Sequence, residues 1–326
     1  MKIAFFDTKP YFKDTFGPLA EKYGYEITFF DERLTPETAK LAAGHDATCS
    51  FVNDEVPAEA VRTLKEVGVK VILLRCAGFD SVDLDAAKEC GLPVLRVPAY
   101  SPESVAEQGA ALLLGVNRKV HLSYNRSVKF NFNIAGLDGI GLYGKTAGVI
   151  GTGKIGRCMI NILKGMGMKV ICYDAFPAKD SGLEYVDLDT LYKESDVISL
   201  HCPSTPETHH MINAESIAKM KDGVIIVNVA RGALIDSEAL IDAVESGKVR
   251  GAGLDVCEVE HDYFFEDRSN LEKHDPTLAR MLSNENILLT GHLAFLTDTA
   301  LNGIATVTLE NLKAFEEGKE LVNQVK

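Results

Sequence analysis

The stretch Thr146-Ala147-Gly148-Val149-Ile150-Gly151-Thr152-Gly153-Lys154-Ile155-Gly156 decides the fold of the second part of the chain. The residues up to Ile150 predict a buried strand, and a Gly-x-Gly-x-x-Gly turn follows it directly and opens a helix that runs to about Met166. In this context the first glycine makes a tight turn, the second lets a diphosphate approach the backbone, and the third allows close helix–strand packing. Free N–H groups at the helix N-terminus then bind the diphosphate. We therefore predict a dinucleotide site that includes Gly151, Gly153, Lys154, Ile155 and Gly156.

A second strand, Lys169–Tyr173, completes this unit and ends at Asp174, 18 residues after Gly156. A carboxylate in this place accepts hydrogen bonds from the ribose hydroxyls of the adenosine. The next residues, 175–177, include no arginine or lysine that would bind a 2′-phosphate. The carboxylate would also repel such a phosphate, so the sequence predicts NAD rather than NADP.

Strands and helices alternate along almost the whole chain. Nearly continuous apolar strands are typical of a parallel sheet that helices cover on both faces. Ser101 is a good helix N-cap and Pro102 suits the first helical position, so a helix from there to about Val120 marks a domain boundary. The predicted fold class is α/β, with two doubly wound parallel-sheet domains. The predicted strands are Lys2–Asp7, Glu26–Asp31, Ala47–Phe51, Val69–Cys76, Pro93–Val97, Thr146–Ile150, Lys169–Tyr173, Asp196–His201, Gly223–Val229, Gly253–Val256 and Asn286–Thr290.

Composition limits the classes of function. The 326 residues carry a formal net charge of −13, which argues against nucleic acid or anionic lipid as the main partner. No run of 18 or more uncharged apolar residues predicts a transmembrane helix, and the N-terminus is typical of a first strand rather than a signal peptide. The seven cysteines are widely spaced and form no Cys-x-x-Cys pair, which favours reduced thiols in a cytoplasmic protein.

Three polar side chains follow predicted strands of the second domain, at the edge where such sheets bind ligands. Arg231 ends an apolar strand, and its planar guanidinium suits a carboxylate, with a structural ion pair as the alternative. His292 follows another strand and can exchange protons near neutral pH, although a lone histidine is more often structural. Glu260 is by itself one acid in the long acidic connection Glu258–Asn286, a candidate functional insertion.

These motifs resemble the D-2-hydroxyacid dehydrogenase family over nearly the whole chain, and most closely its fermentative D-lactate dehydrogenases. The segments that carry the resemblance are Gly151–Gly156 with Asp174, Ser195–Pro203, Asn228–Asp236, Gly253–Val256, Tyr100–Pro102, His261–Asp267 and Gly291–Phe295. The resemblance implies that Arg231 holds the substrate carboxylate and that His292 is the general acid in reduction and the base in oxidation. It also implies that Glu260 pairs with His292 and stabilises the imidazolium.

The resemblance implies further contacts of two kinds. Those expected at the substrate are Arg75, Ala77, Gly78, Tyr100 and Phe295. Those expected at NAD, besides the glycine turn and Asp174, are His201, Cys202, Pro203, Thr208, Val229, Ala230, Arg231 and Asp255.

The family arrangement also implies the domain organisation. A Rossmann-type NAD domain, residues 101–295, is expected as an insertion in a flavodoxin-like substrate domain made of residues 1–100 and 296–326. The active site is expected in the cleft between them, with hinge closure over bound substrate. A cytoplasmic homodimer through the NAD domain is expected as well.

The expected reaction is reduction of pyruvate by NADH to D-lactate. Two alternatives remain open at this point: a bulkier 2-oxo acid, branched or aromatic, and a non-enzymatic NAD-sensing protein on the same fold. Cys257, Leu293 and Leu296 depart from residues common in the family, which leaves the size of the substrate side chain open. No metal site is predicted, because adjacent residues such as His209 and His210 seldom converge on one ion.

Overall fold

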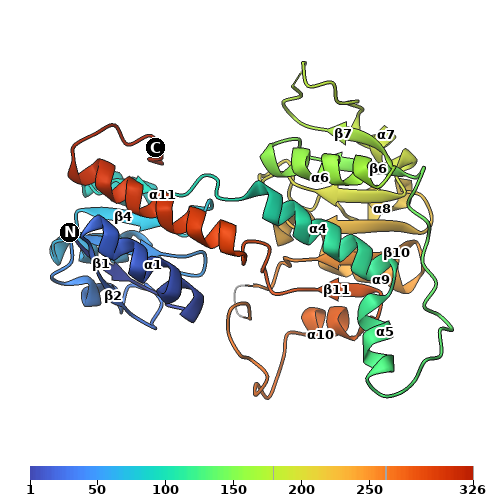
Figure 1. Cartoon of the computed structure of the whole chain (residues 1–326), viewed down its shortest axis with the longest axis horizontal. Helices are drawn as coiled ribbons and strands as arrows, with labels where there is room; N and C mark the ends of the chain where they lie inside the picture. The colour runs from blue at the N-terminus through green and yellow to red at the C-terminus, as the bar shows by residue number, and fades with distance from the viewer. Residues whose placement is uncertain (179, 261–262, 326) are drawn as a thin grey trace. The chain divides into compact units, whose positions relative to one another are not determined.

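The computed structural model describes residues 1–178, 180–260 and 263–325 and divides into two α/β units (Figure 1). Unit 1 is Met1–Ser101 with Leu296–Lys326, and unit 2 is Pro102–Phe295. The predicted fold class, two doubly wound parallel-sheet domains, is confirmed. His261 and Asp262, which belong to one of the segments that carry the family resemblance, lie outside the described residues.

Unit 1 is built on a parallel five-stranded sheet in the order β2-β1-β3-β4-β5, whose order reverses between β1 and β3. The C-terminal helix α11 packs on this unit, where Tyr25 donates to Glu316 at 2.8 Å, and the residues after it pair with β5. The elements are β1 (Lys2–Phe5), α1 (Pro10–Tyr23), β2 (Glu26–Phe29), η1 (Ala39–Ala42), β3 (Ala47–Ser50), α2 (Ala58–Glu66), β4 (Val71–Leu74), α3 (Leu84–Glu89), β5 (Val94–Leu95) and α11 (Asp298–Glu316).

Unit 2 is built on a parallel six-stranded sheet in the order β11-β10-β9-β8-β6-β7. Every residue of β9 is buried, because helices cover both faces of the sheet. The elements are α4 (Pro102–Asn117), α5 (Val120–Ser127), β6 (Thr146–Ile150), α6 (Lys154–Gly165), β7 (Lys169–Tyr173), α7 (Leu188–Glu194), β8 (Val197–Leu200), α8 (Ala214–Lys219), β9 (Val224–Asn228), η2 (Gly232–Leu234), α9 (Ser237–Glu245), β10 (Val249–Leu254), α10 (Pro276–Ser283) and β11 (Ile287–Leu289).

The strand order places the ligand-binding edge of unit 2. The chain order reverses between β6 and β8, and in open α/β sheets ligands bind beyond the carboxyl ends of the strands at such a switch point. The glycine turn follows β6 and His201 follows β8, so both stand at this place.

Most predicted strands are longer than the observed ones by a few residues, and two predicted elements differ in other ways. The strand predicted at Gly253–Val256 is β10, Val249–Leu254, because Asp255 leaves the sheet to bind the loop after β11. The helix predicted to about Val120 ends at Asn117, since Lys119 adopts a left-handed φ of +52° that breaks the helix before α5.

Two expectations from composition can be compared with the structure. All seven cysteines are free thiols. Among the described residues, no helix combines the length and apolar character that a membrane crossing requires.

Candidate active site

The glycine turn after β6 has the geometry that a diphosphate site needs. Gly151 has a left-handed φ of +92°, and a Cβ there would lie 2.6 Å from the carbonyl carbon of His201. A Cβ on Gly156 would collide with the carbonyl oxygen of Gly151, so only glycine lets α6 start this close to the turn. Apart from its own neighbours in the chain, no described residue has an atom within 4 Å of the Cβ position of Gly153, which leaves the exposed N-terminus of α6 open to a ligand.

Asp174 directly follows β7 and lies against the same turn. One of its oxygens accepts from the backbone N–H of Thr152 at 2.6 Å and from its hydroxyl at 2.8 Å, and the other accepts from Phe176 N at 2.9 Å. Partial burial opposes ionisation, but these hydrogen bonds together hold the pKa of the Asp174 carboxyl below its usual value. Asp174 is therefore an ionised carboxylate beside the glycine turn, as a ribose contact requires and a 2′-phosphate would not tolerate.

The loop after β8 lies directly against the glycine turn, because β8 is the neighbour of β6 in the sheet. His201 shares a hydrogen bond of 2.8 Å with Ser199, and burial lowers the pKa of its imidazole to about 4, so the ring is neutral at pH 7. Cys202 has a thiol whose pKa burial raises to about 11. The Thr208 hydroxyl donates to Pro203 O at 2.8 Å and closes this loop on itself. A neutral, ordered loop of this kind suits the uncharged ribose and leaves the phosphate charge to the helix N-terminus.

Arg231 stands on a turn that Asn228, the last residue of β9, holds in shape. The Asn228 amide donates to Arg231 O at 2.8 Å and accepts from Ala230 N at 3.0 Å, while Val229 is buried. The Arg231 guanidinium is half-buried and donates to Ala230 O at 2.7 Å. Among the described residues no carboxylate lies within 4.0 Å of it, so none of them forms a structural ion pair with this arginine.

His292 and Glu260 form a pair. The Nδ1 atom of His292 lies 3.1 Å from Oε1 of Glu260, and the other Glu260 oxygen accepts from Cys257 N at 3.2 Å. His292 has a left-handed φ of +52°. Such a conformation is costly for a residue with a side chain and persists where the surroundings impose it. Because Nδ1 faces the carboxylate, Nε2 is the nitrogen left to exchange a proton with a ligand.

Asp255 imposes the shape of the loop that carries His292. Its carboxylate is fully buried and accepts from Leu293 N at 3.1 Å, from Ala294 N at 2.9 Å and from the Thr290 hydroxyl at 2.5 Å. Its backbone oxygen accepts from His292 N at 2.8 Å. The family resemblance implies a contact with NAD for this residue, and in the structure its carboxylate also anchors the loop from Thr290 to Ala294.

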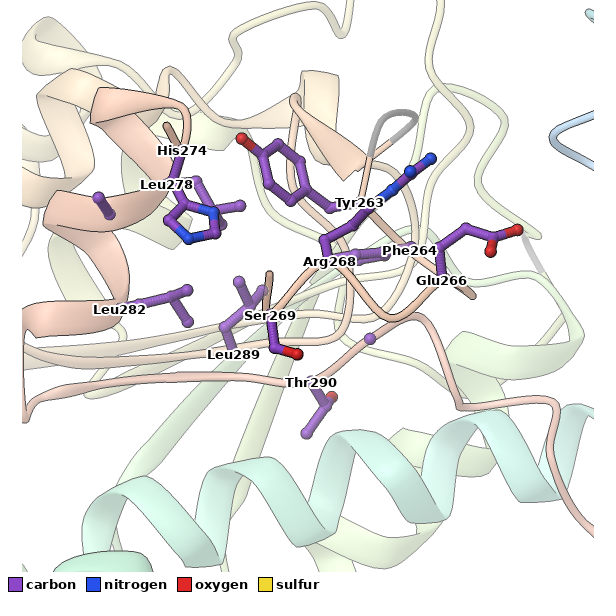
Figure 2. Close-up of a pocket in the computed structure, with 12 residues that line it drawn as sticks. Tyr263, Phe264, Glu266, Arg268, Ser269, His274, Leu278, Leu282, Leu289 and Thr290 are labelled. Atoms are coloured by element: carbon purple, nitrogen blue, oxygen red, sulfur yellow. The ribbon is translucent and has the colours of Figure 1, made fainter. Parts of the chain in front are cut away.

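An aromatic side chain from the insertion lies against the histidine. The ring of Phe265 is centred 5.9 Å from that of His292 and 6.1 Å from that of Phe295. A cavity of about 390 Å³ lies between residues 263–269 of the same insertion, α10 and the end of β11 (Figure 2). Thr290 and Gly291 line this cavity, which therefore borders the histidine loop.

Four residues expected at the substrate belong to unit 1. Ala77, Gly78 and Tyr100 are half-buried, and Ala77 O accepts from Arg96 at 2.8 Å. Arg75 differs from the expectation, because its side chain is fully buried in the core of the unit.

The Arg75 guanidinium donates to Asp7 O at 2.9 Å, and its central carbon lies 4.3 Å from the ring centre of Phe5 and 4.9 Å from that of Phe51. This placement supports a structural role and not a direct substrate contact.

Comparisons with known proteins identify the family to which the chain belongs. Residues 110–294 match the family described as "D-isomer specific 2-hydroxyacid dehydrogenase, NAD binding domain". The chain is 51% identical to a D-lactate dehydrogenase of Escherichia coli (strain K12), with all of both chains covered. The chain belongs to the D-isomer specific 2-hydroxyacid dehydrogenase family. It is thus an NAD-dependent oxidoreductase, and the non-enzymatic alternative is set aside.

Two further matches differ in the substrates their names print. A solved structure described as the pyruvate reductase of Chlamydomonas reinhardtii is 44% identical, with a TM-score of 0.94 and 99% and 98% of the two chains covered. An aromatic 2-oxoacid reductase of Clostridium sporogenes is 45% identical, with 97% of this chain and 96% of that protein covered. Family membership therefore fixes the reaction class of this dehydrogenase and leaves its preferred substrate to experiment.

Several residues that build this dehydrogenase's site were not found from the sequence. Thr152 fixes Asp174, and its hydroxyl shares a hydrogen bond of 2.9 Å with Tyr185. Thr290 fixes Asp255, and it accepts from Gln108 of α4 at 3.1 Å. Thr152 lies inside the glycine motif, where its side chain could have drawn notice, but Tyr185 and Gln108 carry no sequence signal because they act through distant parts of the chain.

Proposed function

We propose that this dehydrogenase reduces pyruvate with NADH to D-lactate. The observation that carries the proposal is the set Arg231, Glu260 and His292, which follow the adjacent strands β9, β10 and β11 at one edge of the sheet. Reduction of a small 2-oxo acid needs a cation that binds the substrate carboxylate and a histidine, paired with a carboxylate, that gives a proton to the carbonyl oxygen. The likeness to the Escherichia coli D-lactate dehydrogenase supports pyruvate as the substrate.

Arg231 would bind the substrate carboxylate. Its guanidinium offers paired N–H donors in a fixed plane, which matches the two oxygens of a carboxylate. Half-burial strengthens the contact, because the charges attract one another more in a medium less polar than water. Binding in this way would fix the orientation of the carbonyl relative to His292.

His292 would give a proton from Nε2 to the carbonyl oxygen in reduction and take it back in oxidation. Glu260, 3.1 Å from Nδ1, would keep the ring oriented and favour its protonated form. Phe265 lies against the imidazole and would limit its access to water.

NADH supplies the hydride in this reaction, and the residues present fit it. The open turn at Gly153 and the N-terminus of α6, with Lys154 and Ile155, would hold the diphosphate. The Asp174 carboxylate would bind the adenosine ribose. His201, Cys202, Pro203, Thr208, Val229 and Ala230 would line the remainder of the cofactor site.

The substrate is tested with purified protein, NADH and a panel of 2-oxo acids, followed by nicotinamide absorbance. We expect the highest kcat/KM with pyruvate. A higher value with phenylpyruvate or 2-oxoisocaproate would replace pyruvate by a bulkier substrate. The chirality of the product, measured by chromatography on a chiral phase, should be D.

The acid–base pair is tested by His292→Gln and Glu260→Gln. Loss of the proton donor should lower kcat by about 10²- to 10⁴-fold while NADH binding survives. Glu260→Gln removes only the charge beside Nδ1, so pyruvate reduction should move to lower pH and recover part of its rate there. D-lactate oxidation, which needs the neutral ring, should suffer less at pH 7. An unshifted reduction profile would show that Glu260 does not act on His292.

The assembly and location belong to the same proposal. Helix α5 (Figure 1) has no buried residue. The connection after it exposes large apolar side chains, including Phe130 at 88% and Phe132 at 74%. Exposed apolar surface of this kind marks an interface, and we assign it to a second copy of the chain. Sedimentation velocity should show a dimer that Phe130→Asp together with Phe132→Asp dissociates, and a wild-type monomer would refute this. The free thiols favour a cytoplasmic location.

A further inference from the structure

Two loops of unit 2 bring together His209, His210 and Glu258. The two histidines follow Thr208 in the loop after β8, and Glu258 follows β10. Each offers one ligand atom, and these atoms all lie within 4.8 Å of one another. None of the three has a part in the proposed reaction.

The backbone explains why two adjacent histidines face the same way. His210 has a left-handed φ of +49°, and the two imidazole rings stack with centres 4.0 Å apart and planes 27° apart. Hydrogen bonds hold this conformation: His210 N donates to Ala233 O at 2.9 Å, and the Asn213 amide donates to His210 O at 2.8 Å. The general rule that neighbours on a chain diverge therefore does not apply here.

Glu258 is oriented toward the histidines by a third segment. One oxygen lies 2.5 Å from Nε2 of His210, and the other accepts from Ser237 N at 3.1 Å and from its hydroxyl at 2.7 Å. Partial burial opposes ionisation, but the bonds from His210 and Ser237 hold the pKa of the Glu258 carboxyl below its usual value. Glu258 is thus an ionised carboxylate whose second oxygen is held by Ser237, while the first faces the histidines. Carboxylates that bind metals are commonly oriented by hydrogen bonds of this kind.

We propose that His209, His210 and Glu258 bind a divalent transition metal ion of the zinc class. Imidazole and carboxylate ligands in this combination suit Zn²⁺ and its neighbours Co²⁺, Ni²⁺ and Cu²⁺ rather than Mg²⁺ or Ca²⁺. Ligand bonds of about 2.0–2.2 Å place the donors of a tetrahedron about 3.3–3.6 Å apart. To reach this spacing, His210 Nε2 and Glu258 Oε1, now 2.5 Å apart, must separate by about 1 Å. The exposed His209 side chain can rotate to bring its own ligand atom, which lies within 4.8 Å of the other two, to the ion.

The number of protein ligands determines how firmly the proposed site would hold its ion. Three protein ligands leave a fourth position to water, so binding is exchangeable rather than closed. The ion would replace the His210–Glu258 hydrogen bond and join the loop after β8 to the loop after β10. The second of these loops carries Glu260 two residues beyond Glu258, so metal occupancy would stiffen the segment beside the catalytic pair.

The test is titration of metal-free protein, without substrate or cofactor, so that it stands apart from the proposed reaction. Zn²⁺ is followed by calorimetry and Co²⁺ by its visible absorption bands, which gain intensity in tetrahedral coordination. We expect one ion per chain. His209→Gln should weaken binding by about tenfold or more, since even changes in residues that support a metal ligand have effects of this size.

Two control variants locate the ion. His274→Gln removes another exposed histidine of unit 2, and His292→Gln breaks the other histidine–carboxylate pair. Both should bind Zn²⁺ as the wild type does. Absence of saturable binding, binding unchanged by His209→Gln, or binding lost in His292→Gln would each overturn the proposal. Because His209 is exposed, its variant should keep the melting temperature of the metal-free protein.

Discussion

Replacement of Asp255 by asparagine tests whether this buried residue positions the catalytic histidine. The carboxylate accepts three hydrogen bonds from the loop that carries His292, two from Leu293 N and Ala294 N and one from Thr290. An amide keeps only one oxygen. That oxygen should face Leu293 and Thr290, where two donors lie, so the new NH₂ group would face the N–H of Ala294.

The expected loss of kcat in Asp255→Asn follows from these contacts. A hydrogen bond to a charged group is worth about 1.5–3 kcal/mol, and a buried N–H left without a partner costs about 1–3 kcal/mol. Relaxation of the loop would relieve part of this cost by moving His292 away from its place. We expect kcat for pyruvate to fall by about 100-fold, which corresponds to about 2.7 kcal/mol. Thr290→Val is the matched control, because it removes one of the three hydrogen bonds and leaves the carboxylate to both backbone N–H groups, so kcat should fall less than in Asp255→Asn, by about tenfold.

Steady-state kinetics in both substrates separates the two roles of Asp255. If the residue anchors the loop, kcat falls while KM for NADH changes little. A raised KM for NADH with kcat preserved would show that the carboxylate acts on the cofactor, as the family resemblance implied. Near-normal values of both would refute the anchoring role. Thermal unfolding of the variant checks that unit 2 remains folded.

Two further changes test how the protein binds the pyruvate carboxylate and the adenosine ribose of the cofactor. Arg231→Lys keeps the charge and loses the planar fork, so kcat/KM for pyruvate should fall about 30-fold or more, given that a buried charged contact is worth about 2–5 kcal/mol. KM for NADH should change much less, and near-normal pyruvate kinetics would remove Arg231 from the site. Asp174→Ala combined with Ala175→Arg should weaken NADH binding by about tenfold or more, because the hydrogen bonds from the ribose to the carboxylate are lost. The same variant should accept NADPH, because the new arginine can bind the 2′-phosphate. The measurement is the ratio of kcat/KM for the two cofactors, and a wild type that already prefers NADPH would contradict the interpretation of Asp174.

Much of the fold could be predicted from local pattern. Strands β6 and β7 have the predicted bounds, because a fully buried parallel strand is a continuous apolar run between turn residues. The glycine turn could also be predicted from the sequence, because the left-handed φ at Gly151 and the close backbone contact at Gly156 each require glycine. Strand ends elsewhere shifted by a few residues, because hydrogen bonds from other elements decide where the chain leaves the sheet.

The sequence by itself determined the fold class, the glycine turn, the acidic residue at the end of β7 and the residue types suited to the reaction. Tertiary structure decided which of these groups meet. It paired His292 with Glu260, buried Arg75 among phenylalanine rings, turned Asp255 to the loop from Thr290 to Ala294, and placed His209 and His210 beside Glu258. The physical reason is that apolar periodicity and turn chemistry act over a few residues, whereas these contacts join side chains that lie 24 to 70 positions apart or depend on a single left-handed φ.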